Sequence, residues 1–213
     1  ELNIESASQV HNVDYSKPIK NGPNSVGFDY YYGISASLDM VPYTFIENDR
    51  VAKLPSVEKD FPMFLGREKG KCRKGPAAPD FEVEDVLPTL TNKAIDFVKA
   101  RSVDAKAGKP FFLYLPLASP HTPIAPTKDW QGKSGLNYYA DFVMQTDHSL
   151  GLILAELDRL GIADNTLVVL TSDNGCSPQA DFPELLSKGH NPSHLFRGHK
   201  ADIFEGGHHI PFI

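Results

Sequence analysis

The chain has 213 residues, of which 41% are hydrophobic, and its formal net charge at pH 7 is −6. This length suits one domain with a buried core, or most of a larger domain. The acidic balance argues against nucleic acid as a partner, because no basic face is present to neutralise phosphates. The sequence contains no run of about twenty apolar residues, so we expect no membrane span.

The chain begins at Glu1 without an initiator Met and shows no signal peptide. We therefore expect that sequence precedes it in the natural protein. The two cysteines, Cys72 and Cys176, are too few for a disulfide scaffold and lack the spacing of a metal site. The sequence predicts neither their redox state nor the oligomeric state of the protein.

The first half of the chain predicts short strands joined by loops. Residues 27–33 are aromatic and bounded by glycines, which favours a short strand or a tight turn. Residues 43–47 alternate well enough to predict another strand, and a turn follows at residues 48–49. Residues 53–80 hold Lys, Pro, Gly and Arg with little apolar content, so we expect a long surface excursion there.

The second half alternates helices and apolar strands. Residues 89–101 and 137–160 carry apolar side chains at helical spacing, and Gly161 caps the second helix. Residues 111–117 and 167–170 are apolar runs typical of strands buried in a parallel sheet. This order predicts an α/β fold with a largely parallel central sheet and helices on both of its faces.

The second apolar run leads directly into Asp173 and Asn174. A strand that ends in this way brings a carboxylate and an amide oxygen to the carboxyl edge of a sheet, where open α/β sheets bind ligands. Oxygen ligands of this kind suit a hard divalent cation such as calcium. The alternative is an Asx turn that ends the strand and binds nothing.

His121 follows the first apolar run, in a loop that reads Pro-His-Thr-Pro. Pro120 and Pro123 fix the backbone on either side of it. A rigid loop at the carboxyl end of a strand is a suitable place to hold an imidazole against a ligand. The alternative is a histidine stacked in a proline-rich turn.

Lys200 precedes a Glu-Gly-Gly turn at residues 205–207, and its alternative role is that of a solvated lysine. A metal-binding pair, an imidazole and a lysine at one sheet edge would suit a tetrahedral oxyanion ester, with the cations neutralising charge and the imidazole transferring a proton. The residues alone therefore predict metal-assisted hydrolysis of a phosphate or sulfate ester, without choosing between them.

Three motifs in this order closely resemble the arylsulfatase family: PHTP at residues 120–123, TSDNG at residues 171–175 and GHKADIFEGG at residues 198–207. The stretches at residues 27–39 and 73–91 also resemble that family, so the resemblance covers nearly the whole chain. It implies an alkaline-phosphatase-like α/β fold and hydrolysis of sulfate esters with calcium bound.

The resemblance also implies roles for particular residues. Asp173 and Asn174 would be two of the calcium ligands. His121 would contact the sulfate and help to protonate the leaving oxygen, and Lys200 would bind the sulfate and stabilise its developing charge. The implied substrates are sulfated glycans or aryl sulfates, and the implied location is the periplasm or the extracellular space.

The chain departs from the family at its nucleophile. Sulfatases carry a Cys/Ser-x-Pro-x-Arg motif whose first residue becomes formylglycine, and this chain has none: Cys72 has the wrong context, and after Cys176 the position of the arginine holds Ala180. The family's N-terminal aspartate pair, its Gly-Lys-x-His segment and its C-terminal domain are also absent. We therefore expect residues 1–213 to be the central part of a sulfatase catalytic domain, incomplete and inactive alone, with formylglycine in a missing N-terminal part.

Two other functions stay open. The first is a phosphomonoesterase or phosphodiesterase of the same superfamily, which an upstream Ser or Thr nucleophile with two metal sites would favour. The second is a non-catalytic domain that binds calcium or a sulfated glycan, which an upstream region without any nucleophile would favour.

Overall fold

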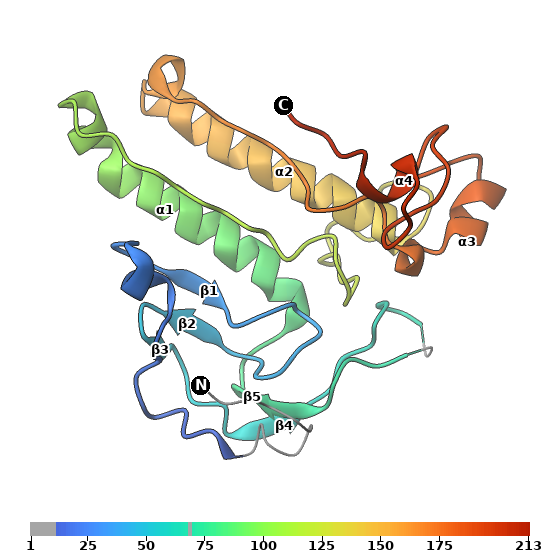
Figure 1. Ribbon diagram of the computed structural model, residues 1–213, viewed down its shortest axis with the longest axis horizontal. Helices are drawn as coiled ribbons and strands as arrows, with labels where there is room; N and C mark the ends of the chain where they lie inside the picture. The colour runs from blue at the N-terminus through green and yellow to red at the C-terminus, as the bar shows by residue number, and fades with distance from the viewer. Residues whose placement is uncertain (1–11, 68–69) are drawn as a thin grey trace. The chain divides into compact units, whose positions relative to one another are not determined.

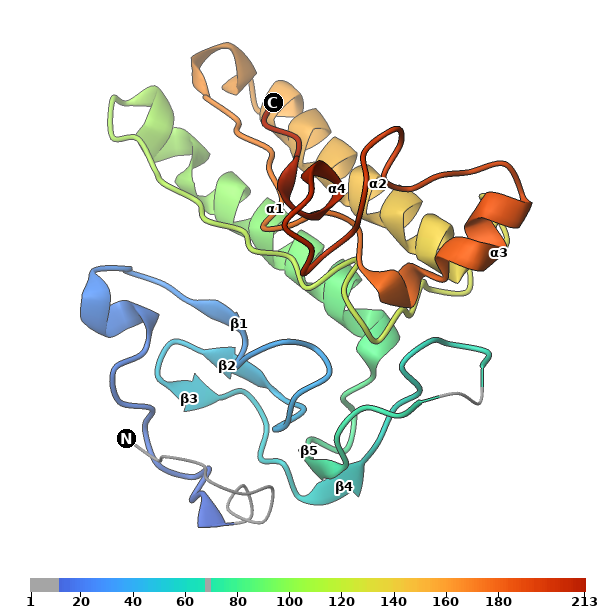
Figure 2. The same ribbon diagram turned by 45° about the vertical axis from the view of Figure 1, so that its right-hand side comes forward.

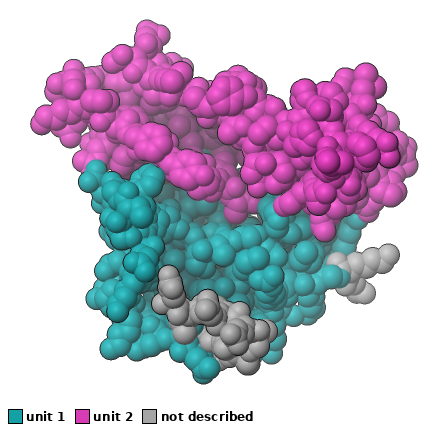
Figure 3. Space-filling model, viewed as in Figure 1, with its two compact units in different colours: residues 1–93, 121–125 teal, residues 94–120, 126–213 magenta. Residues whose placement is uncertain are grey.

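The computed structural model describes residues 12–67 and 70–213. The chain divides into two compact units, each described here by itself: residues 1–93 with 121–125, and residues 94–120 with 126–213 (Figure 3). The described strands are β1 (Tyr32–Ile34), β2 (Phe45–Glu47), β3 (Arg50–Val51), β4 (Val57–Lys59) and β5 (Gly75–Ala77). The α-helices are α1 (Val86–Lys106), α2 (Tyr138–Arg159), α3 (Phe182–Ser187) and α4 (Glu205–His208).

The first unit contains two small antiparallel sheets (Figure 1). Strands β1, β2 and β3 pair in that order, with Gly33 opposite Ile46. Asn48 has a φ of 55° between β2 and β3, the left-handed conformation that tight hairpin turns require and Asn tolerates. The strand and the turn predicted at residues 43–49 are therefore confirmed.

An aromatic cluster forms the core of the first unit. The Tyr43 ring, 1% exposed, meets the Phe61 ring edge to face at a centroid distance of 5.0 Å, and Phe81 lies 6.0 Å away. Each buried ring of this size stabilises the fold by about 1.5–3 kcal/mol. Because Phe61 belongs to residues 53–80, that segment is more than the surface excursion expected from its composition.

Residues 53–80 instead form a partly buried antiparallel arm. Strands β4 and β5 pair within it, with Glu58 opposite Pro76. Phe64 and Cys72 are 7% and 5% exposed. The low apolar content of residues 53–80 did not predict this arrangement, because a few aromatic side chains are enough to pack a two-stranded segment against the core.

The second unit is built on two long helices (Figures 1 and 2). Val98 of α1, Leu157 of α2 and Ile162 are buried together. Asn137 caps the start of α2 by accepting a hydrogen bond from the Ala140 N–H at 3.2 Å. The helix predicted at residues 137–160 is therefore confirmed almost to its ends, and the one predicted at 89–101 is confirmed but extends further at both ends.

The C-terminal end of α2 has the glycine cap that the sequence predicts at Gly161. Gly161 has a φ of 65°, a conformation that glycine adopts without steric cost. The Ile162 N–H then donates to the Leu157 carbonyl at 3.1 Å, and the Gly161 N–H donates to the Asp158 carbonyl at 2.9 Å. These are the hydrogen bonds of a Schellman motif, which glycine at this position favours.

The predicted parallel sheet is not formed by the described residues, in which every named strand pairs antiparallel. Residues 111–117 are extended and alternate in exposure, with Phe112 at 75%. Leu167 is 90% exposed, and within residues 12–67 and 70–213 Leu170 exchanges backbone hydrogen bonds with Ile213 alone. An apolar run favours burial, but a strand forms only where a neighbour supplies ladder hydrogen bonds, and no described segment supplies a full ladder to either run.

None of the helices in the described ranges is both long enough and apolar enough to cross a membrane.

Candidate functional site

His121 lies in the first unit, in a loop whose following residues are fixed by backbone hydrogen bonds. Ile124 is 1% exposed, its N–H donates to the Met63 carbonyl at 2.9 Å, and its carbonyl accepts from the Leu65 N–H at 2.9 Å. Pro123 is also fully buried. The imidazole therefore projects from a segment anchored to the arm at residues 53–80, which agrees with the rigidity predicted for this loop.

The surroundings of the His121 ring define which nitrogen carries the proton. Its Nδ1 lies 2.8 Å from the Thr122 carbonyl oxygen and 3.2 Å from the Ser37 Oγ. A carbonyl oxygen only accepts hydrogen bonds, so Nδ1 must be the donor. None of the described residues forms a hydrogen bond with the Nε2 atom, and this nitrogen is therefore open to a ligand.

A carboxylate completes this cluster, and sequence reasoning did not assign it a role. The Asp39 Oδ1 accepts a hydrogen bond from the Ser37 hydroxyl at 2.5 Å and lies 4.0 Å from the His121 Nδ1. Ser37 and Asp39 stand 84 and 82 residues before His121, so no local pattern could join them. The only signal was that Asp39 belongs to one of the stretches that resemble the arylsulfatase family.

Buried Tyr43 holds the Asp39 loop in place. Its hydroxyl donates to the Arg73 carbonyl at 2.5 Å and lies 3.4 Å from the Asp39 carbonyl, which also accepts from the Arg73 N–H at 3.4 Å. Burial, aided by the nearby Cys72 and Asp39, raises the pKa of Tyr43 well above its ordinary value. The hydroxyl thus stays protonated and remains a donor.

Asp173 and Asn174 lie in the second unit, on a bend after the extended residues 167–171. Neither side chain forms a hydrogen bond or an ion pair with the described residues. An Asx turn requires the side-chain oxygen to accept a backbone hydrogen bond, so this alternative finds no support. The two side chains keep their oxygens available for a cation.

Asp173 and Asn174 fit calcium as two of its ligands, but they cannot fill its whole coordination shell. Calcium takes about six to eight oxygen ligands, and Asp173 with Asn174 supplies at most a few of them. The described ranges contain no group of three or more His, Cys, Asp or Glu side chains that could hold a metal. Further ligands would have to come from other oxygens.

The backbone brings Lys200 next to the Asp173–Asn174 bend. The Lys200 N–H donates to the Cys176 carbonyl at 2.8 Å, and the Gly175 N–H donates to the Gly207 carbonyl at 2.9 Å. A Cβ at Gly175 would overlap the carbonyl oxygen of Gly206. The glycines of both motifs are thus required for this close approach, and the structure joins three of the four predicted site residues within one unit.

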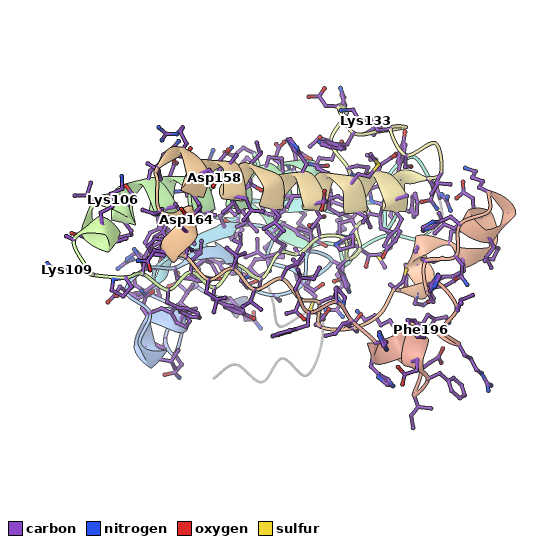
Figure 4. The ribbon with its side chains drawn as sticks, turned by 90° about the horizontal axis from the view of Figure 1, so that it is seen from above. Lys106, Lys109, Lys133, Asp158, Asp164 and Phe196 are labelled. Carbon is purple, nitrogen blue, oxygen red and sulfur yellow. The ribbon has the colours of Figure 1, made fainter. Side chains whose placement is uncertain are left out.

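The loop that carries Lys200 has its own support. The Phe196 ring, labelled in Figure 4, stacks on the His209 ring at a centroid distance of 4.3 Å. The His209 Nδ1 lies 2.7 Å from the Glu205 Oε2. This hydrogen bond lowers the pKa of the exposed Glu205 carboxyl, so the carboxylate persists at neutral pH.

Neither cysteine is prepared for nucleophilic chemistry. Burial, with the charges of Asp39 and Asp60, raises the pKa of the Cys72 thiol to about 11. Burial also raises the pKa of the Cys176 thiol, which lies 3.2 Å from the Tyr139 hydroxyl. A reactive cysteine needs a lowered pKa, and the rejection of Cys176 as the nucleophile agrees with this geometry.

Comparison with known proteins identifies the family. The sulfatase family model matches residues 11–213. The chain therefore belongs to the sulfatase family, and the resemblance inferred from its motifs is confirmed.

Individual relatives agree with this assignment. An N-acetylgalactosamine-6-O-sulfatase of Bacteroides thetaiotaomicron is 30% identical over 234 residues, which covers 94% of this chain and 45% of the relative. The human N-acetylgalactosamine-6-sulfatase is 37% identical over 191 residues, covering 90% of this chain and 33% of the relative. The chain thus spans between a third and a half of the length of these curated relatives.

A solved structure supports the fold. A protein studied for the metabolism of multiple glycosaminoglycans by Bacteroides thetaiotaomicron superposes with a TM-score of 0.77 at 29% identity, over 94% of this chain and 48% of that one. The predicted α/β, alkaline-phosphatase/sulfatase-like fold class is confirmed, although its parallel sheet is not among the described strands. The roles of His121, Lys200, Asp173 and Asn174 stay predictions.

Proposed function

We propose that the full-length protein hydrolyses sulfate esters of glycans and that this chain supplies part of its active site. The family match over residues 11–213 is the observation that carries this proposal. The relatives named above act, by their names, on N-acetylgalactosamine 6-sulfate. A sulfated amino sugar is therefore the substrate that we test first.

We assign each predicted residue one task. Lys200 binds the sulfate and stabilises the charge that develops on it. His121 gives a proton to the leaving oxygen, a role that its open Nε2 supports. Asp173 and Asn174 help to hold calcium, which when bound supplies positive charge that polarises the sulfate ester.

The nucleophile is proposed to lie outside these 213 residues, as formylglycine. The chain contains no Cys/Ser-x-Pro-x-Arg motif, and the raised pKa of both thiols supports the view that neither cysteine replaces it. We therefore expect the 213-residue chain by itself to release no sulfate.

The test uses the full-length product of the gene with N-acetylgalactosamine 6-sulfate and with 4-nitrophenyl sulfate. We expect sulfate release that falls when a chelator removes calcium and returns when calcium is added. Lys200→Ala should lower kcat/KM by about 100-fold or more, as the loss of one charge-stabilising group typically does. Lys109→Ala serves as the control, because Lys109 is exposed and lies just beyond the C-terminal end of α1 (Figure 4).

Two outcomes would replace this function. Turnover of 4-nitrophenyl phosphate without turnover of either sulfate ester would favour the phosphoesterase of the same superfamily. Calcium-dependent stabilisation and binding of a sulfated glycan, with no turnover of any ester, would favour the non-catalytic binding domain.

A further inference from the structure

We propose that Asp39, acting through the Ser37 hydroxyl, positions His121 as the proton donor to the leaving oxygen. This inference rests on the proposed function and adds two positioning residues to it. Neither residue touches the reacting atoms in this scheme. Each acts on the imidazole that does.

The first step of the argument is the direction of the hydrogen bonds. The Nδ1 of His121 must donate, because the Thr122 carbonyl at 2.8 Å only accepts. The same nitrogen lies 3.2 Å from the Ser37 Oγ, and the Ser37 hydroxyl donates to the Asp39 Oδ1 at 2.5 Å. A chain of donors therefore runs from the ring through Ser37 to a carboxylate.

The second step is the charge. The Asp39 Oδ1 lies 4.0 Å from the His121 Nδ1, and both side chains are partly screened from solvent, at 20% and 39% exposure. No Lys or Arg of the described ranges forms an ion pair with Asp39. Its negative charge is therefore available to compensate an imidazole that carries both protons.

The third step is the support behind Asp39. Leu38, between Ser37 and Asp39, is 2% exposed and fixes the loop by its burial. The Asp39 carbonyl accepts from the Arg73 N–H, and the buried Tyr43 ties both segments together. A carboxylate held by packing and by backbone hydrogen bonds can orient its partner more closely than a mobile one.

The chemistry follows from this arrangement. As the S–O bond of the ester breaks, its electron pair stays on the sugar oxygen. The sulfuryl group would be taken up by a hydroxyl of the hydrated formylglycine proposed to lie outside these residues, and that hydroxyl would lose its proton to a base that also lies outside the described site. The proton on the Nε2 of doubly protonated His121 moves to that oxygen, which leaves as an alcohol. The ring becomes neutral and keeps its proton on Nδ1, and Asp39 stays ionised throughout.

The test compares good and poor leaving groups. A sugar alkoxide needs this proton, whereas 4-nitrophenolate leaves without it. Asp39→Asn keeps the shape and the hydrogen-bond acceptor for Ser37 but removes the charge. We expect it to lower kcat for N-acetylgalactosamine 6-sulfate by about 10- to 100-fold, part of the range that a general acid supplies, and to change kcat for 4-nitrophenyl sulfate by less than about threefold.

Two further variants sharpen the test. Ser37→Ala should reproduce the selective loss, and its effect should not add to that of Asp39→Asn, because both act through one path. Asp80→Asn is the matched control, since Asp80 is an exposed carboxylate of the same unit whose partner is Lys53. It should leave both substrates unaffected.

A measurement without turnover keeps the two proposals distinguishable. The ¹⁵N shifts of the neutral His121 imidazole report the share of rings whose proton lies on Nδ1, the nitrogen that faces Ser37 and Asp39. We expect this share to fall in Asp39→Asn and to stay unchanged in Asp80→Asn, whether or not the protein hydrolyses any sulfate ester. An unchanged share in Asp39→Asn, or an equal loss of kcat on both substrates, would overturn the positioning role.

Discussion

At the scale of single residues, Cys72 shows how packing changes chemistry. Its side chain is 5% exposed, and its Sγ lies 3.6 Å from the Met63 Sδ. Burial raises the pKa of the thiol from 9.0 to about 11, because a thiolate is poorly solvated in such a place. The cationic sequence around Cys72 suggests the opposite shift, but its buried side chain overrides that local pattern.

This shift predicts how stability depends on pH. The folded state holds the Cys72 proton more tightly than the unfolded state, so the contribution of Cys72 to the free energy of unfolding is complete below pH 9. It is lost as the pH rises from 9 towards 11. Urea unfolding at a series of pH values should show a steeper decline over this range for the wild type than for Cys72→Ala. Parallel declines would contradict the prediction.

At the scale of elements, α2 orders the loop before it through a buried polar face. The Asp141 carboxylate, 0% exposed, accepts hydrogen bonds from the N–H groups of Gly132 and Ser134, both at 2.7 Å. Gln145, one turn later, accepts from the Thr127 N–H at 3.0 Å. The apolar stripe predicted from the helical period includes Phe142, which is buried, but also Val143, which is 41% exposed. It does not include the buried polar residues Asp141 and Gln145, because the period is followed through apolar side chains alone.

Asp141→Asn tests this role. The asparagine side chain keeps one oxygen, which still accepts a hydrogen bond. Its NH₂ group replaces the other oxygen and would face the N–H of Gly132 or Ser134. One strong hydrogen bond is therefore replaced by two donors that point at each other. We expect the free energy of unfolding to fall by about 2–3 kcal/mol, the range for hydrogen bonds to a charged group. Asp147→Asn, on the exposed face of the same helix, should change it by less than about 0.5 kcal/mol.

The elements also differ in how well the sequence predicts them. Helix α2 is set by local periodicity and by caps at Asn137 and Gly161, and all of these can be read along the chain. The arm at residues 53–80 depends on Phe61 and Phe64 meeting a distant core. The apolar run at residues 111–117 predicts a strand but contains no information about its neighbours.

At the scale of the whole molecule, the candidate site depends on contacts between motifs far apart in the sequence. Physical patterns suggest His121, Asp173, Asn174 and Lys200 one at a time, and the resemblance to sulfatases supplies their common purpose. The pairing of His121 with Ser37 and Asp39 escapes both approaches, because it crosses more than 80 residues. Only the folded chain reveals it.

A glycine contact between motifs provides a test at this scale. Gly175→Ala would push a methyl group into the Gly206 carbonyl, and overpacking of this kind costs about 1–3 kcal/mol. Gly151→Ala is the matched change, because its Cβ meets no atom within 4 Å and lies inside α2. It should stabilise the protein by about 0.5–1 kcal/mol. Thermal unfolding of the two variants should therefore shift in opposite directions, and equal shifts would contradict the contact.

The low reactivity of the Cys72 and Cys176 thiols is useful for site-specific labelling. Cys72 and Cys176 are free, and each holds its proton more firmly than an ordinary cysteine. A new cysteine at the exposed tip of α1, near Lys106 and Lys109 (Figure 4), would react with a maleimide dye at neutral pH well before either of them. A single fluorescent or spin label can thus be placed at this tip without first replacing Cys72 or Cys176.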